Sequence, residues 1–145
     1  MPLLQPKRTK YHKAHRGRNR GKALRGNHLS LGEFGVRAAG NGRMTSRQIE
    51  AVRVLIRRRI GDRGKLWIRV FPHLPVTKHP LETRMGKGKG AVDRYEARIR
   101  RGQILFEVAG VPREIAKNAL SKVRHKLSIP VDVVTLATHE GRPWR

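Results

Sequence analysis

Apolar residues recur at helical spacing in two stretches of the chain. The first stretch follows Thr45, which can form a capping box with Gln48, and it ends before Gly61. Its apolar stripe consists of Ile49, Val52, Leu55, Ile56 and Ile60. The pattern predicts an amphipathic helix between Thr45 and Gly61. Among the arginines that lie off the apolar stripe of this helix are Arg53, Arg57 and Arg58.

The second helical stretch begins at Pro112, a residue that suits a first helical turn because its missing N–H needs no partner there. Glu114 near the start and the basic residues between 122 and 126 complement the helix dipole. Pro130 is expected to stop the chain from continuing as a helix. We expect a core face made of Ile115, Ala119, Leu120, Val123 and Leu127.

Other apolar segments have the patterns that are typical of strands. Residues 29–39 alternate loosely up to a turn at residues 40–42, and residues 76–77 and 131–136 predict two further strands. Residues 95–100 and 104–108 predict a hairpin joined at Arg101 and Gly102. Residues 65–71 are apolar on both faces, with Trp67 and Phe71 on one of them, which predicts a central, buried strand.

These elements predict an α+β fold: an antiparallel sheet sandwich with two helices packed on one face, and a basic, extended N-terminal arm. We divide the chain into an arm at 1–28, a core at 29–138 with a Gly/Lys loop at 84–90, and a loose tail at 139–145. A chain of 145 residues is long enough for one core of this kind.

The charge changes the picture, because 34 Lys and Arg residues stand against 10 Asp and Glu residues and give a net charge of +24. A chain this basic repels itself, and a polyanion removes that repulsion. Nucleic acid is the first candidate partner, ahead of an anionic membrane surface and an acidic protein. The chain has no cysteine, and it has no apolar run long enough to span a membrane or to act as a secretory signal.

The arm concentrates this charge, since residues 1–30 contain nine Lys and Arg residues and no acid. Its glycines break any helix, so we expect an extended arm with no core of its own. Because a long cationic run usually has an anionic target, we expect this arm to lie along RNA, and a disordered solubilising tail is the alternative. Tyr11 has no core to join and could stack on a base. The predicted rRNA-binding residues are those of the arm and of the first helix: Lys7, Arg8, Lys10, Tyr11, Lys13, Arg16, Arg18, Arg20, Arg25, Arg53, Arg57 and Arg58. For the three helix arginines, a solvated face is the alternative.

The Gly/Lys loop alternates cations with residues that have no side chain. Glycines let the backbone turn through positive φ and approach another surface closely, while each lysine carries a compact charge for a phosphate. We expect a cationic finger made of Arg84, Met85, Gly86, Lys87, Gly88, Lys89 and Gly90.

The patterns of catalytic and metal sites are missing from the sequence. The glycine-rich stretches lack the spacing and the Ser or Thr of a phosphate-binding loop. The acids are scattered, and we expect them to pair with Arg or Lys rather than with one another. His12 and His15 lack further ligands for a metal ion. We therefore expect no enzyme, no catalytic residue, no metal site and no cofactor.

Several segments together resemble one known family. They include Gln48-Ile49-Glu50-Ala51, Trp67-Ile68-Arg69-Val70-Phe71-Pro72, Arg84-Met85-Gly86-Lys87-Gly88-Lys89-Gly90 and Gly110-Val111-Pro112, and their combination is specific although no single segment is. Taken in order along nearly the whole chain, they are similar to the bacterial-type large-subunit ribosomal protein sixteen family. The tail after Ala137 matches no part of that pattern.

The resemblance implies a structural constituent of the large ribosomal subunit with an α+β sandwich fold. Its members bind large-subunit (23S-type) rRNA, support late subunit assembly and contact tRNA near the A site, with the P site as a second candidate. The implied partners are rRNA, tRNA and neighbouring ribosomal proteins, with no membrane and no small-molecule substrate. Structural Mg²⁺ would belong to the RNA. The implied location is a ribosome in a bacterial cytoplasm or in an organelle matrix, which the resemblance does not distinguish.

Three other classes of protein are alternatives to this one. An architectural DNA-binding protein shares the charge and is the main alternative. A membrane-active protein needs a basic helix with a strongly apolar face that includes Trp or Phe, which neither predicted helix has. A small RNA-modifying enzyme is disfavoured because no nucleophile, metal or cofactor pattern is present.

Overall fold

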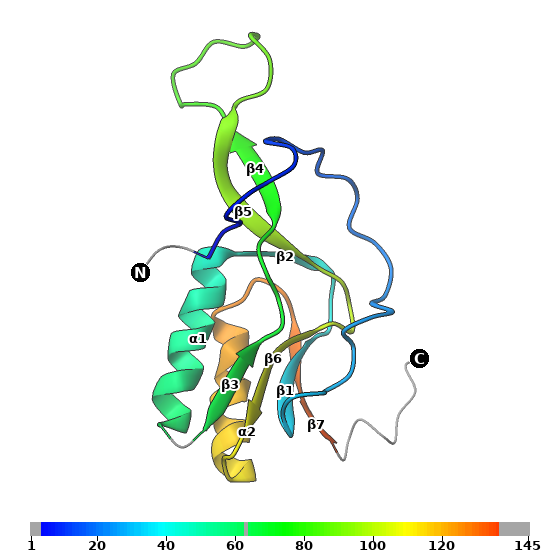
Figure 1. Ribbon diagram of the computed structural model, residues 1–145, viewed down its shortest axis with the longest axis vertical. Helices are drawn as coiled ribbons and strands as arrows, with labels where there is room; N and C mark the ends of the chain where they lie inside the picture. Colours follow the sequence, from blue (N-terminus) through cyan, green and yellow to red (C-terminus); the bar gives the residue numbers. More distant parts are fainter. Residues whose placement is uncertain (1–3, 63, 137–145) are drawn as a thin grey trace.

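The computed structural model describes residues 4–62 and 64–136, which form two antiparallel sheets and two α-helices (Figure 1). The predicted α+β class is confirmed. In chain order the elements are β1 (Phe34–Ala38), β2 (Gly42–Thr45), α1 (Ser46–Ile60), β3 (Lys65–Ile68), β4 (Leu74–Lys78), β5 (Ala91–Ile99), β6 (Ile104–Ala109), α2 (Arg113–Ser121), the 3₁₀ helix η1 (Lys122–His125) and β7 (Val131–Thr135). The predicted tail at 139–145 lies outside the described residues.

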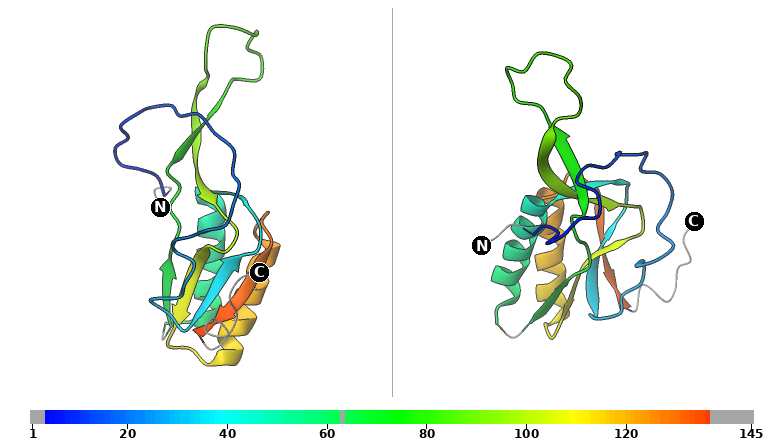
Figure 2. Two further views of the ribbon diagram at one scale, coloured as in Figure 1. Left: turned by 90° about the vertical axis from the view of Figure 1, so that its right-hand side faces the viewer. Right: turned by 45° about the horizontal axis from the view of Figure 1, so that its top comes forward.

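The two sheets have different positions in the molecule. The four-stranded sheet has the order β3-β6-β1-β7, and α1 and α2 pack against each other and against its strands (Figure 2). The three-stranded sheet has the order β2-β5-β4, and its β4–β5 pair projects beyond the helices and carries the Gly/Lys loop at its end (Figure 1). The fold therefore holds the loop away from the core on a two-stranded stalk.

Helix α1 begins and ends where the sequence predicts. The Gln48 N–H donates to Thr45 Oγ1 at 3.2 Å, and the Thr45 N–H donates to Gln48 Oε1 at 2.9 Å, which completes the capping box. Gly61 ends the helix with φ 66°, a conformation that glycine adopts without strain. Of the predicted stripe, Ile49, Val52, Ile56 and Ile60 are buried, and Leu55 is half-buried.

Helix α2 is shorter than predicted, and the face that it buries differs from the predicted core face. After Ser121 the chain tightens into η1, and the buried residues are Ala116, Ala119, Leu120 and Val123. Ile115 was predicted in the core but is 45% exposed. The spacing of Ala116 with the other three is also helical, so periodicity alone could not choose between the two neighbours.

The predicted hairpin of residues 95–100 and 104–108 is wrong. The chain does turn there, because the Gln103 N–H donates to the Arg100 carbonyl at 3.1 Å. However, β5 pairs with β2 and β4, whereas β6 pairs with β1 and β3. The N–H of Gly102 donates to the Ala38 carbonyl at 2.7 Å, and this bond to the end of β1 directs the chain into the other sheet.

The predicted central strand at 65–71 is also wrong in its place and length. Strand β3 ends at Ile68 and lies at the edge of its sheet, next to β6 alone. Trp67 is half-buried, and Phe71 is 46% exposed rather than buried. An apolar run on both faces does not distinguish a central strand from an edge strand that a helix covers, and α1 contacts β3.

Candidate nucleic-acid interface

Residues 4–28 of the arm, and residues 29–32 that connect it to β1 and that we call the root of the arm, form no helix or strand (Figure 1). Each Lys and Arg residue of the arm is exposed: Lys7, Arg8, Lys10, Lys13, Arg16, Arg18, Arg20, Lys22 and Arg25. Tyr11 is 70% exposed, and the Lys10 ammonium lies 5.5 Å from the centre of its ring. The ring and the charges of the arm are therefore accessible to a partner.

Hydrogen bonds to backbone groups attach the second half of the arm to the body. The Asn19 side-chain amide donates to the carbonyls of Gly42 at 2.8 Å and of Ile99 at 2.7 Å, and so bridges β2 and β5. The Ala23 N–H donates to the Arg101 carbonyl at 2.9 Å. Because these bonds use an amide and backbone groups, they position the second half of the arm without engaging its cationic side chains.

The root of the arm is bound by a buried carboxylate, which we did not predict from the sequence. Glu107 lies in the central strand β6 and is fully buried. Its Oε2 accepts the backbone N–H groups of Ser30 at 3.1 Å, Leu31 at 2.7 Å and Gly32 at 2.8 Å. Its Oε1 is paired with the guanidinium of Arg69. An acid within the apolar run of residues 104–109 was the signal in the sequence, because a buried charge requires partners of this kind.

The backbone of the Gly/Lys loop adopts positive φ values, which glycine permits. Gly86, Lys87 and Gly88 have φ values of 106°, 57° and 81° in succession. A non-glycine residue in this region costs about 1–2 kcal/mol, so Lys87 is held in a strained conformation of the kind found at functional sites. Residues 84–89 are exposed, and Met85 and Leu81 place two almost fully exposed apolar side chains in this loop region.

At the base of the loop, Gly90 is needed because its backbone lies very close to the backbone of Lys78. A Cβ on this residue would lie 2.6 Å from the backbone oxygen of Lys78. The two ends of the loop can therefore meet at the end of the β4–β5 pair only because this position has no side chain.

The arm and the loop lie side by side, which the sequence could not reveal. The Lys13 ammonium donates to the Lys89 carbonyl at 2.6 Å, and the Lys89 ammonium donates to the Ala14 carbonyl at 2.7 Å. The Arg98 guanidinium on the stalk also donates to the Arg16 carbonyl. These bonds join two predicted binding segments into one cationic surface, which we call the arm–loop surface (residues 7–25 and 84–90).

The three α1 arginines that the sequence predicts as rRNA-binding are not part of the arm–loop surface. Arg53 donates to Glu50 at 2.8 and 2.7 Å, and this hydrogen bond lowers the pKa of Glu50 and raises the pKa of Arg53. Arg57 donates to the Gly64 carbonyl at 2.7 Å and pairs with Asp62 at 3.3 Å, whereas Arg58 is exposed. Arg53 and Arg57 therefore already have partners within the protein.

The expected pairing of acids with basic residues is confirmed for several of them. Arg94 bridges Asp93 at 2.8 Å and Glu96 at 2.9 Å, so these two carboxylates do not form a catalytic pair. Within residues 4–62 and 64–136, no group of three His, Asp or Glu side chains is arranged to hold a metal ion. Over the same residues, no helix has the length and apolar character that a membrane crossing requires.

Comparison with known proteins shows the family of this chain. A sequence model of the family described as ribosomal protein L16p/L10e matches residues 6–134. The chain is 55% identical over 134 residues to large ribosomal subunit protein uL16 of Sulfurihydrogenibium sp., covering 92% of this chain and 97% of the relative. It is 52% identical over 133 residues to the protein of that name from Sulfurovum sp., with coverage of 92% and 94%. The chain belongs to the ribosomal protein L16p/L10e family.

Proposed function

We propose that the chain is a structural protein of the large ribosomal subunit that binds large-subunit rRNA through its arm and contacts tRNA near the A site through its Gly/Lys loop. Relatives that are 55% and 52% identical to it over 134 and 133 residues are named as large-subunit proteins. The observation that carries the RNA assignment is the arm–loop surface, in which the backbone is tied to the body while the cations stay exposed.

The physical basis of binding is phosphate neutralisation. Each Lys or Arg that meets a phosphate releases condensed counterions, so affinity falls steeply as salt rises. An extended chain with glycines fits between RNA helices, and recognition of this kind depends on RNA shape more than on base sequence. We extend the proposal to late subunit assembly, because one chain that touches several RNA segments stabilises their relative positions.

We leave Arg53, Arg57 and Arg58 of α1 out of this proposal. Arg53 and Arg57 are held by a carboxylate and a carbonyl within the protein. Arg58 lies beside a hollow that is lined by the apolar residues Ala51, Val54 and Leu55. The proposed role is binding rather than catalysis, and it needs no cofactor and no small-molecule substrate. Structural Mg²⁺ would be held by the RNA. Neighbouring ribosomal proteins are further partners, in a bacterial cytoplasm or an organelle matrix.

The loop assignment is tested by Lys87→Ala in assembled large subunits. Lys87 is exposed in the loop, whereas the Lys89 ammonium also donates to the arm, so Lys87 is the cleaner position to change. We expect A-site tRNA affinity to fall about three- to tenfold, which corresponds to one exposed phosphate contact. Lys117→Ala on the outer face of α2 is the matched control. Unchanged tRNA affinity in subunits that carry the variant at full occupancy would refute the loop assignment.

The arm assignment is tested by the triple substitution of Lys7, Arg8 and Lys10 by Ala. These residues precede the attachment points at Asn19 and Ala23, so the variant keeps the bonds that a deletion of the whole arm would remove. The slope of log affinity for rRNA against log salt should decrease by about two to three units. Equal or tighter binding to duplex DNA at matched salt would instead favour the architectural DNA-binding alternative.

A further inference from the structure

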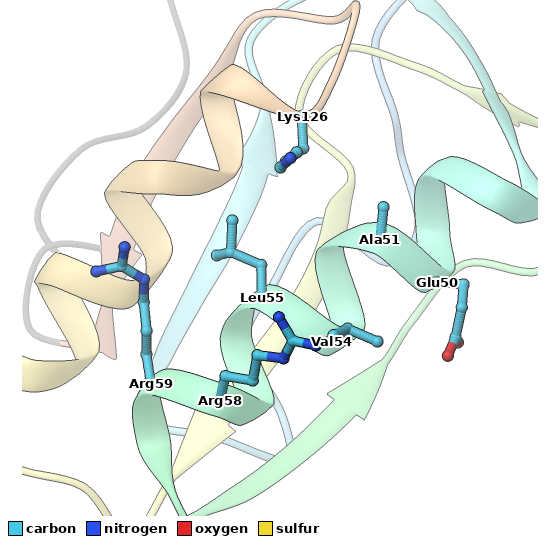
Figure 3. Close-up of a pocket in the computed structure, with 7 residues that line it drawn as sticks. All are labelled: Glu50, Ala51, Val54, Leu55, Arg58, Arg59 and Lys126. Carbon is cyan, nitrogen blue, oxygen red and sulfur yellow. The ribbon is translucent and has the colours of Figure 1, made fainter.

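The apolar surface of helix α1 extends beyond its buried stripe, from the half-buried Leu55 to Val54 and the exposed Ala51. Ala51, Val54 and Leu55 have the spacing i, i+3, i+4, which places them on one side of the helix. They line a hollow of about 580 Å³ that is closed on one side by Lys126, the residue after η1. Figure 3 shows Lys126 reaching toward Leu55 across this hollow. An apolar surface that is wider than the buried stripe is available to a partner, and among the residues that the structure describes none covers Ala51.

Cations surround Ala51, Val54 and Leu55, which we call the floor of the hollow. Arg58 and Arg59 lie at the C-terminal end of α1, and both they and Lys126 are exposed (Figure 3). The hollow has one acid at its edge, Glu50, but its carboxylate is held by Arg53 at 2.8 and 2.7 Å. The charge offered to a partner at this place is therefore positive.

We propose that this hollow is a docking site for an acidic segment of another protein, which inserts an aliphatic side chain between α1 and Lys126 and pairs its carboxylates with Arg58, Arg59 and Lys126. The floor needs an apolar anchor, and a nucleic-acid backbone has none. The floor also has no aromatic side chain on which a base would stack. The inference rests on the shape and chemistry of α1 and does not depend on the proposed function of the arm or the loop.

The position of the hollow allows it to be occupied while the arm–loop surface is bound to RNA. The Gly/Lys loop projects from one end of the molecule, and the C-terminal end of α1 lies toward the other (Figure 1). A partner at α1 would thus add a contact without competing for the same cations. Burial of one leucine side chain at such a site changes affinity about 10- to 100-fold.

The first test measures whether binding depends on the apolar anchor. The full chain is titrated with a short glutamate-rich peptide that has leucines at helical spacing, and with the same peptide in which serine replaces each leucine. We expect the leucine peptide to bind about 10- to 100-fold more tightly at the same salt concentration. Equal binding of the two peptides would mean that only the net charge of the protein is being measured, and it would overturn the proposal.

Two variants locate the preference on the hollow. Ala51→Glu fills the exposed floor with a charged side chain, and Arg58→Glu reverses one charge of the rim. Ala51→Glu should abolish the preference for leucine. Arg58→Glu should weaken the binding of both peptides more than Lys117→Glu, an exposed charge reversal of the same size on α2. If the leucine preference survives in Ala51→Glu, or if Arg58→Glu and Lys117→Glu weaken binding equally, the peptide binds elsewhere and the proposal fails.

The second test asks what covers the hollow in an assembled large subunit. A photoreactive amino acid replaces Val54, and the cross-linked partner is sequenced. A cross-link to a protein segment that combines acidic residues with an aliphatic one supports the proposal. Cross-links to rRNA alone, or none at all in subunits that contain the protein, would overturn it.

Discussion

The buried carboxylate of Glu107 offers the strongest test of how the arm is attached to the body. This side chain is fully buried in β6, where it accepts three consecutive backbone N–H groups from residues 30–32 and is paired with Arg69. We consider Glu107→Gln, which keeps the size of the side chain and removes its charge. The new amide can place its oxygen toward the three N–H groups, but its NH₂ group then faces the Arg69 guanidinium, donor against donor.

The expected loss of stability follows from these contacts. Hydrogen bonds to a charged acceptor contribute about 1.5–3 kcal/mol each and become weaker when the acceptor is neutral. Loss of one member of a buried ion pair costs about 3–5 kcal/mol, and retention of the amide oxygen offsets part of this. We therefore expect Glu107→Gln to lower the free energy of unfolding by about 2–4 kcal/mol. For a domain of this size that corresponds to a fall in Tm of roughly 10 °C.

Urea unfolding followed by circular dichroism measures the change in free energy, and amide hydrogen exchange measures the protection of residues 30–32. Glu82→Gln removes an equal charge from an exposed position and should shift the stability by less than about 0.5 kcal/mol. If Glu107→Gln behaved like this control, or if the amides of residues 30–32 kept their protection, the carboxylate would not be what fixes the root of the arm.

Three further substitutions test the local geometry. Thr45→Ala removes the side-chain half of the capping box and should destabilise the protein by about 1 kcal/mol in a urea titration; no change would mean that α1 does not depend on its cap. Gly90→Ala places a Cβ 2.6 Å from the Lys78 oxygen, so the β4–β5 pair must shift, and we expect a loss of about 1–3 kcal/mol. An unaltered thermal midpoint would contradict this close approach. Asn19→Ala removes two hydrogen bonds to β2 and β5, and it should increase proteolysis of the arm while the helix content stays constant; an unchanged rate of cleavage would contradict the proposed attachment.

The parts of the fold that the sequence predicts well depend on local interactions. The capping box at Thr45, the stripe of α1 and the stop at Gly61 involve residues within a few positions of one another, so the sequence contains all the information that they need. The alternating pattern likewise locates β7 close to its observed ends, whereas β4 is longer than the predicted residues 76–77. The charge and the glycines of the arm and the loop are also local, and composition alone is enough for them to indicate the class of partner.

The errors concern pairing between distant residues. The segments 95–100 and 104–108 have the pattern of a hairpin, but each finds its partners in a different sheet, and the preference of Ala116 over Ile115 depends on the surface against which α2 packs. Periodicity shows that one face of a helix or strand is buried, but it does not show which other element covers that face.

The sequence by itself determined the α+β class, the helix caps and the cationic character of the arm and the loop, because each follows from short-range spacing or from composition. Only the tertiary structure decided that Lys13 meets Lys89, that Glu107 binds the root of the arm, and that α1 has an apolar hollow edged by Lys126. These contacts join residues about 70 or more positions apart, and the free energy that selects them comes from packing of the whole chain rather than from any local pattern.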